Sequence, residues 1–116
     1  MNIEESDSSA AILNIAVDGD TTFKRTITYK ENDIPVDTTY FEGEFVVFYP
    51  QTCKQIYIWS TANGKLVYSD TGKYDINQFI DVADDVIDKG DYEYYFLLKD
   101  GDGVILKYLR GKFIIK

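Results

Sequence analysis

The sequence contains no histidine and only one cysteine, Cys53. Without histidine the chain cannot build a Ser-His-Asp triad or a Cys-His nucleophile pair, and it lacks the commonest side-chain ligand of transition metals. A single cysteine cannot form a disulfide within the chain or a cysteine-based zinc site. These absences exclude the best-known nucleophilic enzymes and most metal centres, so we expect a protein without catalytic residues, cofactor or bound metal.

Long apolar runs and an excess of positive charge are missing as well. No stretch approaches the roughly 20 apolar residues that a membrane helix needs. Residues 1–7 are acidic, whereas a signal peptide starts basic and then becomes apolar. The net charge of −8, from 20 acidic and 12 basic residues, repels nucleic-acid phosphates and anionic lipids. We therefore expect synthesis in the cytoplasm and binding to neither nucleic acid nor membrane.

Aromatic and aliphatic residues, in contrast, are plentiful. Hydrophobic residues make up 45% of the 116 positions and include ten tyrosines and seven phenylalanines, which suffices for a core without metals or disulfides. The length suits one domain, and no Gly-, Ser- or Pro-rich linker divides the chain. We predict a flexible N-terminal arm at residues 1–10 and a single domain at residues 11–116.

Residues 88–116 give the strongest structural signal. The even positions from Tyr92 to Leu98 are all apolar, and they share one face because side chains alternate along a strand. An Asp-Gly-Asp-Gly turn at residues 100–103 follows, and then a second apolar strand that runs to Ile115 with an interruption at Gly111. The pattern predicts a long antiparallel hairpin that closes the chain.

Shorter segments earlier in the chain predict further strands. Pro35 favours an edge strand or an extended connector over residues 34–39, because proline cannot donate a backbone hydrogen bond. Alternating or continuous apolar residues indicate the remaining strands, which we expect at residues 11–17, 22–29, 45–49, 56–61 and 66–69.

The dipeptide Asn63-Gly64 favours a tight hairpin between two of these strands. Asparagine followed by glycine suits the positive φ angles at both central positions of a type I′ turn. A two-residue loop places Trp59 opposite Tyr68, where the two rings pack as a cross-strand pair.

One segment has helical periodicity. Asp75 and Gln78 fit the N-cap and the third position of a capping box. Apolar and acidic residues then recur on opposite faces, the apolar ones at Ile76, Phe79, Ile80, Ala83 and Ile87 and the acidic ones at Asp81, Asp84, Asp85 and Asp88. We predict one short amphipathic helix that ends before Gly90 and leads into the closing hairpin.

The entrance to the closing hairpin has the pattern Asp88-x-Gly90-x-Tyr92 before a buried strand. This pattern resembles the tyrosine corner of immunoglobulin-like sandwiches, in which the Tyr hydroxyl bonds to the backbone a few residues upstream, although an ordinary turn before a strand looks the same. Trp59 has the position along the chain of the core tryptophan in such domains, while Tyr94 replaces the usual cysteine. The predicted fold class is mainly β, an antiparallel immunoglobulin-like β-sandwich of about seven to eight strands with one short helix before the closing hairpin.

Several different short motifs follow one another in a definite order along nearly the whole chain. They are a Leu/Ile strand at residues 12–15, a strand at 22–27, a Pro-x-Asp connector at 35–39, Gly-x-Tyr-x-Tyr at 90–94 and an apolar last strand at 113–115. This order resembles tailed-phage structural domains, those at the N-terminus of baseplate upper proteins and in related small virion proteins, although Thr38 stands where that family usually has Leu. The resemblance implies a stand-alone virion component, either a capsid decoration, a head fibre or a tail- or baseplate-associated subunit. Its partners would be other virion proteins or further copies of itself.

The second face of the closing hairpin is apolar where a solvated face would carry Thr, Lys and Glu. Its residues Tyr95, Leu97, Leu106 and Tyr108 can be opposite or diagonal neighbours. Either the helix or the N-terminal arm covers them, or they dock on another protein, and they are the candidate protein interface. Two other functions stay open: a carbohydrate-binding host-recognition module, in which exposed tyrosines stack on sugar rings, and a small acidic inhibitor of a host protein.

Overall fold

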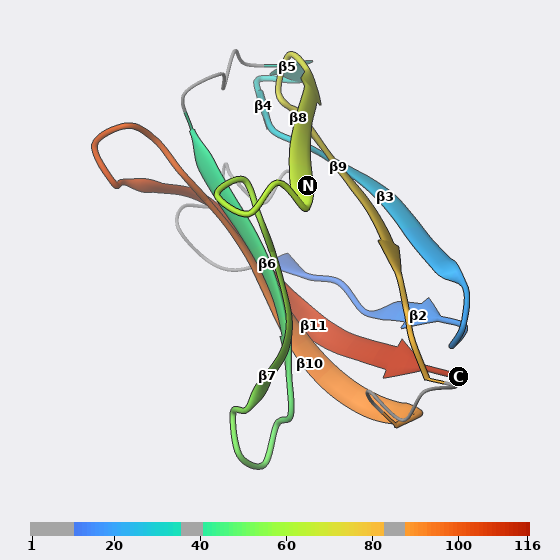
Figure 1. Cartoon of the computed structure of the whole chain (residues 1–116). Coiled ribbons are helices and arrows are strands. Elements are labelled where there is room, and N and C mark those ends of the chain that lie inside the picture. Colours follow the sequence, from blue (N-terminus) through green and yellow to red (C-terminus); the bar gives the residue numbers. More distant parts are fainter. Residues whose placement is uncertain (1–10, 36–40, 83–87) are drawn as a thin grey trace.

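The computed structural model describes residues 11–35, 41–82 and 88–116, which form two main β-sheets that face each other (Figure 1). The larger sheet has six strands, β1 (Ala11–Ile12), β2 (Ile15–Val17), β6 (Glu42–Phe48), β7 (Gln55–Ser60), β10 (Gly90–Lys99) and β11 (Ile105–Ile115). Their order is β1-β11-β10-β6-β7, and β2 also pairs with β11. None of the described segments is a helix long and apolar enough to cross a membrane.

The smaller sheet packs on one face of the larger one. Its order is β3-β9-β8, with β3 (Thr22–Thr28), β9 (Lys73–Phe79) and β8 (Leu66–Asp70). A separate ribbon joins β4 (Lys30–Glu31) and β5 (Ile34–Pro35), so Pro35 lies in a short two-stranded element. The rest of the predicted connector, residues 36–39, and the predicted arm at residues 1–10 lie outside the described residues.

The predicted closing hairpin is confirmed and forms the middle of the larger sheet. β10 pairs antiparallel with β11 along its whole length, from Gly90 opposite Ile115 to Lys99 opposite Ile105. The even positions of β10 are buried as expected, namely Tyr92, Tyr94, Phe96 and Leu98. The other edge of β10 pairs with β6, so β10 has a partner on both sides.

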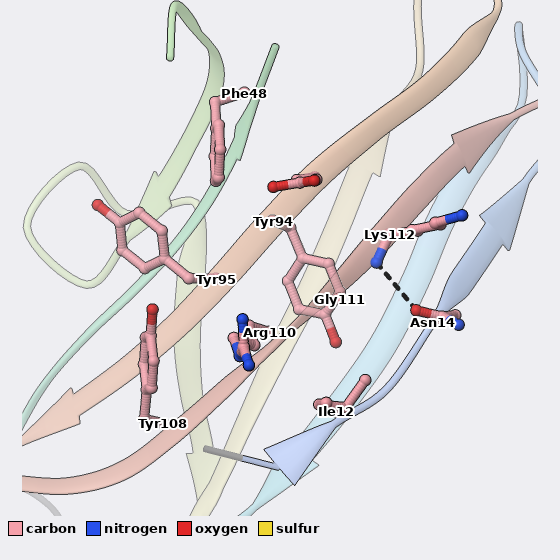
Figure 2. A pocket seen from close by; sticks show the side chains of 10 residues that line it. Ile12, Asn14, Phe48, Tyr94, Tyr95, Tyr108, Arg110, Gly111 and Lys112 are labelled. Atoms are coloured by element: carbon pink, nitrogen blue, oxygen red, sulfur yellow. Dashed lines mark hydrogen bonds between the residues drawn. The ribbon is translucent and has the colours of Figure 1, made fainter. Parts of the chain in front are cut away.

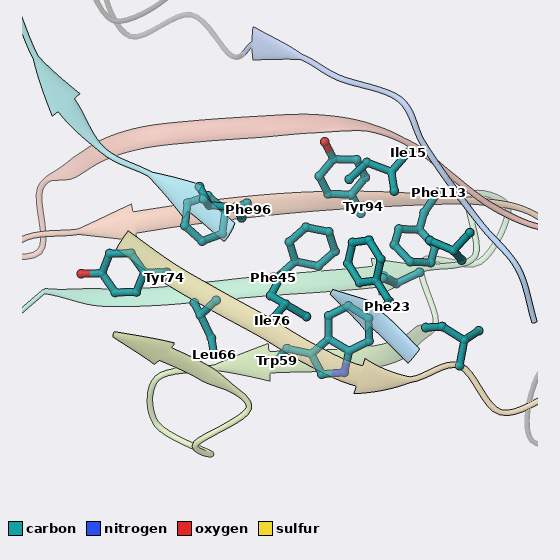
Figure 3. Packing of buried hydrophobic residues seen from close by; sticks show 14 of the residues in the cluster. Ile15, Phe23, Phe45, Trp59, Leu66, Tyr74, Ile76, Tyr94, Phe96 and Phe113 are labelled. Atoms are coloured by element: carbon teal, nitrogen blue, oxygen red, sulfur yellow. The ribbon is translucent and has the colours of Figure 1, made fainter. Parts of the chain in front are cut away.

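The core is a cluster of aromatic rings between the two sheets (Figure 3). Phe45 of β6 stacks on Tyr94 with 4.7 Å between ring centroids and on Trp59 with 5.4 Å. Phe113 meets Phe45 edge-on at 6.1 Å, and Phe23 of the smaller sheet meets Phe113 edge-on at 5.5 Å. Stacked and edge-to-face pairs at such distances stabilise beyond the burial of their area, so these rings hold the two sheets together.

The predicted helix is wrong where the structure describes it. Residues 73–79 form β9, which pairs with β3 on one side and β8 on the other. Tyr74, Ile76 and Ile80 are buried, whereas Phe79, which a helix would bury with Ile76, is 53% exposed. This alternation is that of a strand. The remaining predicted helical positions, residues 83–87, lie outside the described residues.

The predicted hairpin around Asn63-Gly64 is also wrong. β7 belongs to the larger sheet and β8 to the smaller one, so residues 61–65 connect the two layers. The Cα partner of Trp59 is Phe45, and that of Tyr68 is Tyr74. Trp59 and Leu66 are both buried in the core from opposite sheets, which a flat hairpin would not allow. The dipeptide therefore makes a corner between sheets.

The entrance to β10 contains the hydrogen bond expected of a tyrosine corner. The Tyr92 hydroxyl donates to the backbone carbonyl of Asp88 at 2.5 Å. Burial and the neighbouring Tyr49 hydroxyl raise the pKa of Tyr92, so this hydroxyl keeps its proton. Gly90 has a φ of 148°, which residues with a side chain rarely adopt. Gly90 therefore begins β10 in a backbone conformation that favours glycine.

β1 and β2 run along the same edge of β11 and are separated by a short step at residues 13–14. Both pair parallel with β11, one on each side of this step. Within the step, the Leu13 amide donates to the Arg110 carbonyl at 2.9 Å, and the Asn14 Oδ1 accepts from the Lys112 amide at 3.0 Å. The buried Tyr94 hydroxyl donates to the Leu13 carbonyl at 2.7 Å, so a core residue holds the step between β1 and β2 in place.

Replacing Tyr94 by phenylalanine is expected to lower the free energy of unfolding at neutral pH by about 1–2 kcal/mol, because the Leu13 carbonyl loses its donor. Burial raises the pKa of Tyr94 to about 12 in the folded chain, above the usual value near 10. The wild-type chain therefore loses stability as the pH rises from about 10 towards 12, because the unfolded state gives up this proton first. Chemical denaturation at neutral and at alkaline pH should show the wild-type advantage over Tyr94→Phe shrinking. An advantage that stays constant would contradict this assignment.

Candidate functional site

The outer face of the larger sheet, which points away from the core, carries the candidate site. Register across the sheet aligns one residue from each of five strands in a single row: Ile58, Val46, Tyr95, Arg110 and Ile12. Neighbouring positions on the same face add Phe48, Leu97 and Tyr108. We call these eight side chains the outer patch.

Three of the four predicted interface residues lie together in this patch. Leu97 and Tyr108 are direct cross-strand partners, and the rings of Tyr95 and Tyr108 are 6.3 Å apart. Leu106 does not join them. The register shifts between Leu98 and Lys99, which leaves Leu106 without a Cα partner, and its side chain packs against the core cluster.

The other apolar members of the patch were missed in the sequence. Phe48 lies with its ring 6.2 Å from Tyr95, Ile58 is 43% exposed and Ile12 is 69% exposed. Val46 is buried although it does not belong to the core cluster. Alternation along residues 45–49 does place positions 46 and 48 on one face. It gives no indication that this strand lies beside β10, and that neighbourhood creates the patch.

Charged side chains surround the aromatic part of the patch and carry both signs. Glu93 of β10 and Lys112 of β11 are cross-strand partners. The Tyr95 hydroxyl donates to Glu44 Oε1 at 3.3 Å. Burial, with the nearby Glu44 carboxylate, raises the pKa of Tyr95, so its hydroxyl remains a neutral donor at physiological pH. The face thus combines apolar contact area with polar groups around it.

A groove of about 420 Å³ runs over the patch (Figure 2). Tyr95 and Tyr108 form one side of the groove, Ile12 and Asn14 form the other, and Arg110 lies between them. Its volume is within the usual range for small-ligand sites. Rings, a guanidinium and an amide together can contact a planar or a hydroxylated ligand, or a side chain of a protein partner.

The residues predicted to be structural lie elsewhere. Trp59 is buried in the core, and Tyr92 and Gly90 form the entrance to β10. Within residues 11–35, 41–82 and 88–116, no group of three or more Cys, Asp or Glu side chains is placed to hold a metal ion.

No protein-family model matches the chain, and no curated protein matches it. Among solved structures it is similar to the NK cell receptor Nkp44, described as a triggering partner in natural cytotoxicity. The TM-score is 0.52 and the identity 14%, over 94% of this chain and 100% of that one. It is also similar to fibronectin(III)-like modules of Clostridium thermocellum CbhA, with a TM-score of 0.46 and 14% identity over 95% of this chain and 92% of that one. At such identities only the fold is comparable, and the chain is an immunoglobulin-like β-sandwich.

Proposed function

We propose that this chain is a non-enzymatic structural protein of a bacteriophage virion, which binds neighbouring virion proteins through the outer patch. The phage assignment is supported by the order of short motifs along the sequence. The binding assignment is supported by the composition of the patch. A subunit of this kind decorates the capsid, belongs to a head fibre or associates with the tail or baseplate.

The observation that carries the proposal is the largely apolar row across the larger sheet. An antiparallel sheet with one solvated face normally places polar residues there, whereas this row brings Ile58, Val46, Tyr95 and Ile12 into register with one cation, Arg110. Aromatic residues and arginine are enriched at the centres of protein interfaces, and charged residues at the rim. The patch has this composition, with Glu44, Glu93 and Lys112 around it.

Tyr108→Lys and Leu97→Asp are each expected to reduce incorporation of the chain into purified particles at least tenfold. Each change puts a charge into the centre of the patch, where docking would bury it without a partner. The measurement is the amount of chain that co-purifies with particles when the variants replace the wild type during infection. Val67→Asp is the matched control, because Val67 is 52% exposed on the other sheet, and it should incorporate normally.

Thermal unfolding of the same variants separates docking from folding. Both outer-patch variants should unfold near the wild-type temperature, because Leu97 and Tyr108 lie outside the core cluster. Normal incorporation of folded Tyr108→Lys and Leu97→Asp chains would overturn the assignment of the patch.

A carbohydrate-binding module for host recognition is the second candidate, and the groove over the patch favours it. Tyr95 and Tyr108 offer ring faces for stacking on sugars, and Asn14 and Arg110 offer donors for hydroxyl groups. A glycan array should then show binding that Tyr108→Ala abolishes. An array on which the wild-type chain binds nothing would remove this candidate.

A further inference from the structure

The smaller sheet has an open edge at β3. Within the described part of the chain, the only strand that pairs with β3 is β9. The Thr21 carbonyl accepts from the Ile80 amide at 2.9 Å, and the Tyr29 amide donates to the Gly72 carbonyl at 2.7 Å. The backbone N–H and C=O groups of odd-numbered β3 residues therefore bond to β9. Those of even-numbered residues, such as Lys24 and Thr26, point to the open edge.

An apolar pocket of about 230 Å³ opens between the two sheets beside this edge. Its wall includes Leu13, Ile27, Phe45, Tyr94 and Leu109. It is large enough for one aliphatic side chain. A strand that added to β3 would turn every second side chain towards this pocket, since side chains alternate across a sheet.

Arg25 provides a charge at the same place. It lies on β3 between the buried Phe23 and Ile27 and also lines the pocket, and its guanidinium partly offsets the rise in the pKa of Tyr94. Among the described residues, Arg25 has no carboxylate partner. An inward-facing charge on an edge strand disfavours pairing with an apolar strand. A strand with an acidic residue at the matching position is the one that fits.

We propose that residues 1–10 of a second copy of this chain add to the open edge of β3 as an antiparallel strand. This segment has Ile3 and Glu5 two positions apart, which is also the spacing of Ile27 and Arg25. If Glu4 pairs with Thr26, Ile3 lies beside Ile27 over the pocket and Glu5 lies beside Arg25. Backbone hydrogen bonds then give affinity, while the pocket and the ion pair give specificity.

A second copy fits this edge better than the chain's own segment. Ala11 is fixed beside Leu109, which itself lines the pocket. Residues 5–11 extend over roughly 20 Å as a strand, so the chain's own segment would have to double back to return Glu5 to Arg25. Residues 6–10 contain neither glycine nor proline to favour such a reversal. Pairing between copies closes a dimer if the two arms are exchanged reciprocally, and it gives rings or filaments if it runs head-to-tail.

The test is a charge exchange between two variants of the full chain, Arg25→Glu and Glu5→Arg. The wild type should associate with rising concentration in sedimentation velocity, and each variant alone should stay monomeric, because like charges then meet at the edge. An equimolar mixture of the two variants should associate again, since each edge now meets an arm of opposite charge. If residues 1–10 paired with β3 of their own chain, mixing the two variants would not restore association.

Three controls make the outcome decisive. Lys54→Glu changes the net charge as much as Arg25→Glu does, at an exposed turn of the larger sheet, and should associate like the wild type. A synthetic peptide of residues 1–10 should dissociate wild-type assemblies at least tenfold more effectively than the same peptide with Glu5→Arg. Tyr108→Lys should leave this association unchanged, which distinguishes it from binding through the outer patch. A wild-type chain that is monomeric at all concentrations, or a mixture that fails to associate, would overturn the proposal.

Discussion

Gly111→Ala is expected to lower the free energy of unfolding by about 3–5 kcal/mol, a large share of the stability of a small domain. A Cβ atom at this position would point into the backbone of Leu13, 2.8 Å from its carbonyl carbon. The backbone there cannot move away freely, because the Leu13 amide and the Asn14 side chain both bond to β11. Relief of the clash therefore requires β1 and β2 to shift from β11, which also breaks the hydrogen bond from Tyr94.

Urea denaturation measures this loss, and Gly101→Ala is the matched control. A Cβ at Gly101 has no other atom within 4 Å, so this variant should change the free energy of unfolding by no more than about 0.5 kcal/mol. Amide hydrogen exchange should in addition show faster exchange at Leu13 and Lys112 in Gly111→Ala. Equal stability of the two alanine variants would mean that the Leu13 backbone packs less closely on Gly111 than described.

The closing hairpin could be predicted from sequence because its signals are local. Alternation from Tyr92 to Leu98 and the turn at residues 100–103 lie within one continuous stretch. The segment around Ile76 could not be predicted in this way. Ile76 and Ile80 are four residues apart, a spacing that fits both a helix and a strand. Pairing with β3 and β8 decides between them, and β3 is distant in sequence.

The candidate site was predictable to the extent that alternation determines it. Tyr95, Leu97 and Tyr108 share a face as expected. Leu106 does not, because the register shift between Leu98 and Lys99 makes Leu106 an extra residue of β11 without a Cα partner. Phe48 completes the aromatic side only because β6 is the neighbour of β10, and such long-range order has no local sequence signal.

Phe45→Ala is expected to lower the free energy of unfolding by about 3–5 kcal/mol. Phe45 is 1% exposed and lies at the centre of the ring cluster, stacked on Tyr94 and Trp59. Its removal leaves a cavity between the two sheets and ends two stacking contacts, each worth about 0.5–1.5 kcal/mol beyond burial. Neighbouring strands cannot close this cavity easily, because β10 and β7 are fixed to β6 on both sides.

Phe79→Ala is the same substitution at a position that is 53% exposed on β9, and it should cost less than about 1 kcal/mol. Chemical denaturation of the two variants therefore tests the assignment of this segment together with the core. In the predicted helix, Phe79 would share the buried face with Ile76 and Ile80, and its loss would approach that of Phe45. In the observed strand, Phe79 points away from the core, so the two losses should differ by at least about 2 kcal/mol. A smaller difference would contradict the alternation of β9 and favour the helical pattern.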